Sequence, residues 1–81
     1  MATEEPQPWE YAEFTRDISV WDHRLEYSHQ PENNARLGGK DIDIFDIMRQ
    51  LGDFGWELVT VWVEGTAGGV DRAHYVFKRP L

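Results

Sequence analysis

The chain has 81 residues, which is enough for one domain with a single core. Its 15 acidic and 8 basic residues give a formal net charge of −7, so its overall field repels nucleic acids and other polyanions. The absence of cysteine excludes disulfides and thiolate metal sites, and the aromatic residues, 14% of the chain, must supply the core by packing alone.

The first eight residues are polar, acidic and twice interrupted by proline, and we expect them to form a disordered tail ahead of a domain at residues 9–81. This start lacks the basic flank and apolar core of a signal peptide. No apolar run approaches the roughly 20 residues that span a bilayer. We therefore expect a cytoplasmic protein that does not bind membranes.

Two aromatic-rich stretches come first, at residues 9–16 and 20–27. The second alternates strictly, with Trp21 and Tyr27 on the same side, so both stretches are predicted to be extended. The second stretch either pairs with the first as a hairpin, which we favour, or continues it around a bulge at residues 17–19. Residues 28–40 then contain a proline, two asparagines and two glycines, which predicts a long surface loop. A loop of this length is either functional or mobile, and it is our candidate contact for a protein partner.

An amphipathic helix is predicted at residues 42–54 because its apolar side chains occupy one half of a helical wheel: Ile44, Phe45, Ile47, Met48, Leu51 and Phe54. We expect Asp41 to be the N-cap. Gly55 should end the helix in the left-handed conformation, with Leu51 and Trp56 in contact across a Schellman turn. Gly52, in the last turn, is expected to let the helix approach the sheet closely.

Two further strands, residues 56–64 and 72–79, are predicted to form an antiparallel hairpin across a glycine-rich connection. Strict alternation in the first of them places Trp56, Leu58 and Trp62 on one face and Val59, Val61 and Val63 on the other. Both faces are apolar, which is typical of a strand buried on both sides. One helix covers about two strands on one face only, so something else must cover the opposite face.

Three segments resemble a known family: Trp9-Glu10-Tyr11, then Leu51-Gly52 with Gly55-Trp56-Glu57-Leu58-Val59, and Tyr75-Val76-Phe77-Lys78-Arg79-Pro80. Together they are similar to domain of unknown function 4177, a small, mostly bacterial family. The resemblance implies a bacterial protein with a strand–helix–strand–strand fold, and it implies no chemistry because the family is uncharacterised. The stretch from about Asp17 to Lys40 is longer than the matching connection in that family, so a specific function could lie in this insertion.

Catalytic and metal-binding patterns are weak. The histidines His23, His29 and His74 show no HxH or HxxxH spacing, so we expect no metal site and no cofactor. The aspartates at 41, 43 and 46 fit a helix cap and solvent face better than a calcium loop. The glycine-rich connection joins two strands, whereas a phosphate cradle precedes a helix. Ser19 and Ser28 lie in no nucleophile motif, so we expect no catalytic residues.

The sequence thus predicts an α+β fold in which an antiparallel sheet of three or four strands carries one helix on one face. The leading functional interpretation is a non-catalytic interaction module that forms a homodimer through its sheet, with Leu58 and Trp62 as interface anchors. One alternative is a small-molecule binder with a pocket between the apolar sheet face and residues 28–40, where Trp21, Tyr27 and Trp62 would stack on a planar ligand. A second is a hydrolase-like enzyme that uses histidine and glutamate on the sheet.

Overall fold

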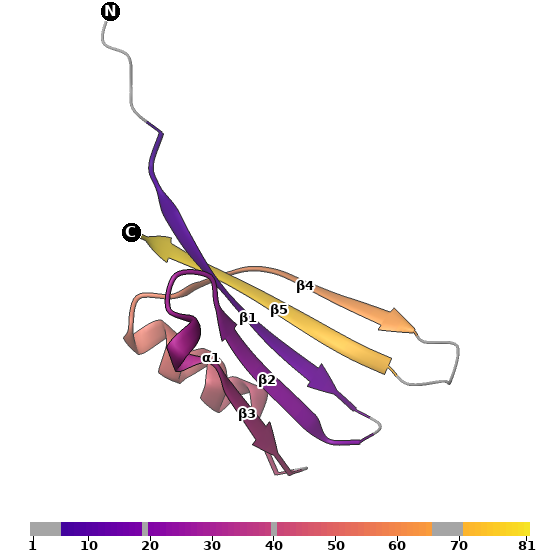
Figure 1. Ribbon diagram of the computed structural model, residues 1–81. Helices are drawn as coiled ribbons and strands as arrows, with labels where there is room; N and C mark the ends of the chain where they lie inside the picture. Colours follow the sequence, from indigo (N-terminus) through magenta and orange to yellow (C-terminus); the bar gives the residue numbers. More distant parts are fainter. Residues whose placement is uncertain (1–5, 19, 40, 66–70) are drawn as a thin grey trace, which may run out of the picture.

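The computed structural model describes residues 6–18, 20–39, 41–65 and 71–81. Its elements are β1 (Trp9–Asp17), β2 (Asp22–Tyr27), a 3₁₀ turn η1 (Pro31–Asn33), β3 (Ala35–Gly38), α1 (Ile44–Asp53), β4 (Glu57–Gly65) and β5 (Asp71–Pro80). The strands form one antiparallel sheet in the order β3-β2-β1-β5-β4, with α1 on one face (Figure 1). The predicted α+β class is confirmed, with five strands instead of three or four. Residues 1–5 of the predicted tail and residues 66–70 of the glycine-rich connection lie outside the described part.

The two predicted hairpins are confirmed. β1 pairs with β2 from Ala12 opposite Tyr27 to Asp17 opposite Asp22, so the second strand begins two residues later than predicted. β1 also pairs with β5 along its whole length and is therefore the central strand. β4 pairs with β5 and forms one edge of the sheet.

Residues 28–40 are not the long loop that their composition predicted. They contain η1 and the short strand β3, which pairs with β2 from Leu25 opposite Ala35 to Asp22 opposite Gly38. The backbone N–H of Tyr27 donates to the Asn34 side chain at 2.7 Å, which closes the turn before β3. The segment thus adds a fifth strand, and its polar residues concealed it because this edge is largely exposed.

The helix is shorter than predicted at its start. Asp43, and not Asp41, is the N-cap, because its carboxylate accepts a hydrogen bond from the backbone N–H of Phe45 at 2.9 Å. The predicted end is confirmed: Gly55 has φ 87°, and the N–H of Trp56 donates to the carbonyl of Leu51 at 3.0 Å, as in a Schellman turn. A Cβ on Gly52 would meet no atom within 4 Å, so the expected close approach there is wrong.

The core lies between α1 and the middle of the sheet, and its buried members are Ala12, Phe14, Leu51, Trp56 and Phe77. Trp56 lies between two partners, the Tyr27 ring at 5.7 Å and the guanidinium of Arg79 at 4.4 Å. Arg79 also pairs with the buried carboxylate of Glu10 and donates to the carbonyl of Phe54 at the end of α1. These contacts join the three segments that resemble the family, because Glu10, Trp56 and Arg79 come from one segment each.

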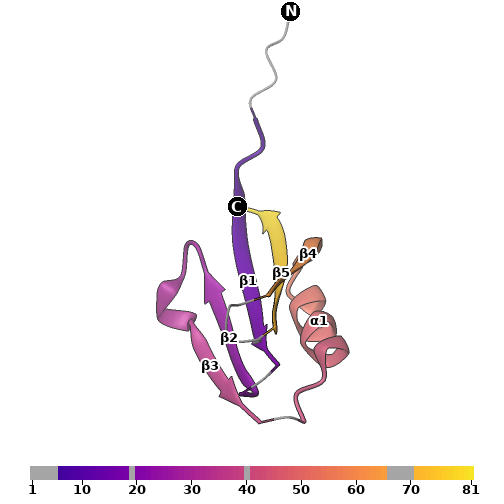
Figure 2. The same ribbon diagram turned by 90° about the vertical axis from the view of Figure 1, so that its right-hand side faces the viewer.

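The predicted division of β4 into two faces is wrong beyond Leu58. A β-bulge between Leu58 and Thr60 shifts the register, so Leu58 faces Phe77 whereas Trp62 faces His74. Phe77 belongs to the core and His74 is an odd number of residues away on β5, so Leu58 and Trp62 lie on opposite faces of the sheet. The outer half of the β4–β5 hairpin also extends past the end of α1 (Figure 1), and Figure 2 shows α1 on one side only. β4 is therefore not buried on both sides.

Candidate functional site

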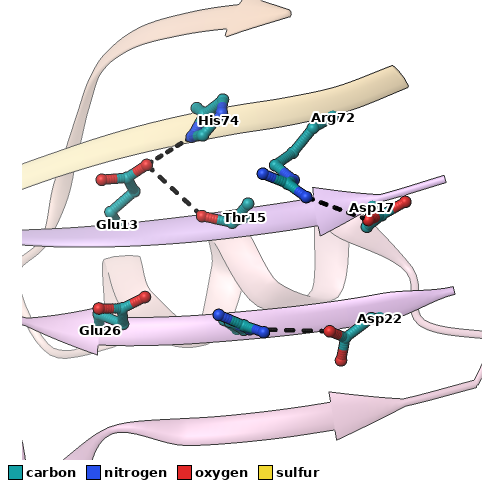
Figure 3. A pocket seen from close by; sticks show the side chains of 8 residues that line it. Glu13, Thr15, Asp17, Asp22, Glu26, Arg72 and His74 are labelled. Carbon is teal, nitrogen blue, oxygen red and sulfur yellow. Dashed lines mark hydrogen bonds and ion pairs between the residues drawn. The ribbon is translucent and has the colours of Figure 1, made fainter. Parts of the chain in front are cut away.

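The face of the sheet opposite α1 is polar, which corrects the expectation of an apolar far face. The inward positions of β1, β2 and β5 hold the large apolar residues, so strand alternation sends their polar residues to this open face. A cavity of about 250 Å³ lies there (Figure 3), lined by Glu13, Thr15, Asp17, Asp22, Arg24, Glu26, Arg72 and His74.

His74 is the centre of this face. Its Nδ1 lies 2.6 Å from Oε1 of Glu13 on β1, and its Nε2 lies 3.0 Å from Oε1 of Glu64 on β4. Carboxylates only accept hydrogen bonds, so both contacts are satisfied only when the ring is a doubly protonated imidazolium. Burial by itself lowers the pKa of His74, but the hydrogen bonds and charges of Glu13 and Glu64 outweigh it and raise the pKa above the ordinary 6.5.

Most other charges on this face are paired as well. Arg72 bridges Asp17 and Glu64, with 3.4 Å to each carboxylate, and Arg36 on β3 holds Asp22 through two bonds of 2.8 and 2.9 Å. The bond from Arg36 is the largest cause that lowers the pKa of Asp22. The side chains on this face thus form two groups of ion pairs, one that joins β1, β5 and β4 and one that joins β2 and β3.

The outer edge of β4 is the other notable surface. Trp62 stacks flat on His74, with 3.8 Å between ring centroids and 5° between planes, yet 47% of Trp62 remains exposed. Three valines beside it, Val59, Val61 and Val63, are 45–63% exposed. Among the described residues, no strand pairs with the outer side of β4. A long apolar edge of this kind offers its free backbone groups to another strand.

The three residues predicted to stack on a ligand do not converge. Trp21 lies in the turn between β1 and β2, at φ 52° and with the Arg16 guanidinium 5.7 Å from its ring. Tyr27 packs on Trp56 on the helix side, whereas Trp62 lies on the open face. Trp21 and Tyr27 lie at opposite ends of the 28–40 segment: the carbonyl of Trp21 accepts from the N–H of Gly39 at 3.2 Å. Tyr27 lies at a cavity of about 230 Å³ lined by Tyr27, Gln30, Asn33, Leu51, Phe54, Trp56 and Arg79.

The histidines lie apart from one another. His23 is fully buried, stacks on Phe14 at 5.7 Å and has Nδ1 3.2 Å from the carbonyl of Leu37. His29 is exposed and bonds to the neighbouring Ser28 hydroxyl. Within the described part of the chain, no three metal-ligating side chains are grouped closely enough to hold a metal ion.

Sequence reasoning missed both the network around His74 and the open edge. The partners of His74 are 61 and 10 residues away in the chain, so only strand order and register reveal them. The edge position of β4 was equally hidden because no local pattern distinguishes an edge strand from a central one. The one available signal was the run from Val59 to Val63, which is too apolar for an ordinary exposed strand.

Comparisons with protein-family models, curated proteins and solved structures found no match to this chain. The resemblance to domain of unknown function 4177 therefore stays a prediction. In the part of the chain that the structure describes, α1 is far too short to cross a lipid bilayer.

Proposed function

We propose that this protein is a non-catalytic interaction module that forms a homodimer by pairing β4 of one copy with β4 of another. The observation that carries the proposal is the outer side of β4, which pairs with no strand of the described ranges and along which Val59, Val61, Trp62 and Val63 are exposed. The sequence-based expectation was a dimer through an apolar face of the sheet. That face is polar, so the proposed contact uses the edge of the sheet instead. It would join two five-stranded sheets into one.

The sequence of β4 suits pairing with its own copy. In antiparallel pairing of two copies of β4, a two-fold axis perpendicular to the sheet relates the copies and keeps each side chain on its own face of the sheet. The residue nearest this axis lies opposite the same residue of the second copy. If that residue is Val61 or Trp62, the apolar stretch covers itself. In neither register does Glu57 or Glu64 face an acid of the second copy, so the flanking charges do not oppose pairing directly.

Side chains on both faces of the edge support the same contact. Val61 and Val63 project to the helix side, opposite Tyr75 and Ala73 of β5, and Trp62 projects to the open side. The two copies of Trp62 would lie opposite or diagonal to each other, within reach for aromatic contact. A contact of one strand is small, so we expect a dissociation constant on the order of 10 µM.

The environment of His74 supports a non-catalytic role. Both of its nitrogens are engaged by carboxylates, so the ring offers no free lone pair to a substrate or a metal. The hydroxyl directly across from His74 in the strand register is that of Thr15, which donates to Glu13 at 3.4 Å, and Glu13 already binds His74. This arrangement suits a cross-strand tie better than a general base with a nucleophile.

The test is sedimentation velocity on the wild type and on a matched pair of valine-to-lysine variants. Val63 on β4 is 63% exposed, and Val20, in the turn between β1 and β2, is 66% exposed. In both variants, lysine therefore replaces a valine of similar solvent exposure. Val63→Lys should weaken dimerisation at least about tenfold because lysine is a typical edge-protecting residue. Val20→Lys should dimerise like the wild type.

Circular dichroism and melting must show that both variants fold. A folded Val63→Lys that dimerises like the wild type would contradict the proposal, as would a wild type that remains monomeric at high micromolar concentration. Pairing of β4 with a strand of a different protein is the outcome that a monomeric wild type would favour.

A second candidate function, small-molecule binding, is favoured by the cavity between α1 and η1. Its lining is aromatic, because Tyr27 packs against Trp56 with the two rings tilted by 46°, and Gln30 and Asn33 add polar groups. Its volume of about 230 Å³ is below the roughly 300–1,000 Å³ of typical ligand pockets, so only a planar fragment would fit. Binding of the planar fragment 2-naphthol, measured by NMR titration, should be lost in Asn33→Trp but not in Val20→Lys. No binding to the wild type would contradict this candidate.

A further inference from the structure

His74 joins two carboxylates that belong to different strands. Glu13 lies on the central strand β1, and Glu64 lies near the end of the edge strand β4. The imidazolium donates to both, at 2.6 and 3.0 Å. A neutral ring has a single N–H, so on deprotonation one of the two carboxylates loses its donor and faces a lone pair. The side-chain link from β4 to the central strand β1 through His74 therefore depends on the charge of one ring, beside the backbone pairing of β4 with β5 and the Arg72–Glu64 pair.

The same ring positions Trp62. The indole lies parallel to it at 3.8 Å, and a cation over an aromatic face is attracted to the ring by its quadrupole. Loss of the charge on His74 removes this attraction. Trp62 and Glu64 are thus two residues of the β4 edge whose positions both depend on whether His74 is protonated.

We infer that protonation of His74 is a switch that favours pairing of the β4 edge with a second copy, and that deprotonation weakens this pairing. The inference rests on the proposed homodimer. With His74 charged, Trp62 is held where it meets Trp62 of the second copy, and Glu64 is held back over β5, away from the apolar edge. With His74 neutral, the indole loses its attraction to the ring, and the Glu64 carboxylate is held only by Arg72 at 3.4 Å, so both leave these positions more readily.

The groups around His74 come from four strands. Glu13 and Thr15 approach from β1, Glu64 and Trp62 from β4, and Arg72 from β5 itself. Glu26 of β2 lies directly opposite Glu13 in the strand register. Glu13 and Glu64 favour the charged ring through their hydrogen bonds and charges. The guanidiniums of Arg72 and of Arg24 on β2 lie on the same face, and each is paired with an aspartate, Arg72 with Asp17 and Arg24 with Asp22.

The overall charge acts in the same direction. Each chain carries −7 with its histidines neutral, so two copies repel each other. Protonation of His74 removes one negative unit per copy beside the contact itself. Linkage requires in turn that pairing stabilise the protonated ring, so His74 should bind its proton more tightly in the dimer than in the monomer.

The experiment measures the dissociation constant by sedimentation equilibrium from about pH 5.5 to about pH 8.5, the range in which histidines titrate. In the wild type we expect it to rise at least about tenfold across this range, which corresponds to a shift of about half a unit in the pKa of each of the two copies of His74 on pairing. His74→Gln should show little pH dependence and should pair as weakly as the wild type at high pH. His29→Gln, at an exposed histidine outside the site, should retain the wild-type dependence.

A second readout does not depend on association. The imidazole of His74 should titrate in NMR spectra of dilute monomer above the ordinary value of 6.5, and the indole N–H signal of Trp62 should move with it. A dimer whose affinity does not change with pH would overturn the switch and leave the proposed function standing. If no dimer forms at any pH, both proposals fail. If His29→Gln alone abolished the dependence, the switch would belong to another histidine.

Discussion

The two edges of the sheet differ in every feature that governs pairing with another strand. β3 has four residues, it ends at two glycines, and its Arg36 is bound to Asp22 of the neighbouring strand. β4 has nine residues, and no proline, lysine or arginine interrupts its apolar run. Short length and charge are the features by which natural sheets protect their edges. The molecule thus has one closed edge and one open edge.

The path of the helix explains why no other described segment covers the outer half of β4. α1 follows β3 and precedes β4, so residues 41–56 cross one face of the sheet from the closed edge to the open edge (Figure 2). A helix in this position fills the core over the middle strands and leaves the outer half of β4 beyond its end (Figure 1). The open edge is therefore a consequence of the topology.

The largest effect should come from removing the side chain that anchors each edge. Trp56 leads into β4, is only 7% exposed and packs between Tyr27 and Arg79. Trp56→Ala should lower the free energy of unfolding by about 3–5 kcal/mol. Leu37 on β3 is half-buried, so Leu37→Ala should lower it by about 1–2 kcal/mol. Urea denaturation of both variants measures the difference.

Equal losses in the free energy of unfolding for Trp56→Ala and Leu37→Ala would mean that both edges are anchored equally strongly, and would contradict this comparison. If Trp56→Ala does not fold, Trp56→Phe is the substitute, because phenylalanine keeps part of the contact. Its free energy of unfolding should lie between those of the wild type and Leu37→Ala, or close to that of Leu37→Ala. In either variant, thermal unfolding should stay a single transition, because the domain has one core.

The end of the helix and the β4–β5 hairpin were predicted correctly from the sequence. The helix end was predictable because Gly55, Leu51 and Trp56 occupy fixed positions of one local motif. The β4–β5 hairpin was predictable because both strands are apolar and β-branched or aromatic. The start of the helix was misplaced by two residues because three aspartates precede or open it, and only geometry selects Asp43 as the cap.

Features that depend on register could not be predicted. Alternation along β4 fails at the bulge, which places Trp62 on the open face, and no residue type marks this position in advance. The candidate site depends on this single shift, since it brings Trp62 and Glu64 onto His74. Similarly, β3 is recognisable only through its pairing with β2, because its sequence resembles a loop.

A smaller effect is expected at the turn that leads from α1 into the open edge. Gly55 has φ 87°, a conformation that costs a residue with a Cβ about 1 kcal/mol, and nothing lies within 4 Å of that Cβ. Gly55→Ala should therefore destabilise by about 1 kcal/mol through the backbone alone. Gly52→Ala is the matched control, because this glycine is helical and equally uncrowded, so alanine there should stabilise by up to about 1 kcal/mol. Thermal melting gives both values, and shifts of the same sign would contradict the capping assignment.

The smallest effect that we expect is a difference between the two edges in how their stability depends on pH. The pKa of Asp22 is lowered, chiefly by its hydrogen bond from Arg36, so this tie stabilises β3 above the ordinary value of 3.8 and is lost as the pH falls through the lowered pKa. The pKa of His74 is raised, so its tie stabilises β4 fully below the ordinary value of 6.5 and is lost as the pH rises through the raised pKa. The two edges should therefore loosen at opposite ends of the pH range.

Amide hydrogen exchange of the monomer, corrected for intrinsic exchange rates, measures this loosening strand by strand. At acid pH, protection should fall first in β3, around Arg36 and Leu37, and above neutral pH it should fall first in β4, around Trp62 and Val63. Asp22→Asn should remove the acid response of β3 and leave the response of β4, whereas His74→Gln should do the reverse. Because both ion pairs are partly exposed, solvent screens them, and the changes in protection should stay small compared with those of the core variants. Loss of protection on both edges at the same pH would show that the sheet opens as one unit, and would remove the distinction between a closed and an open edge.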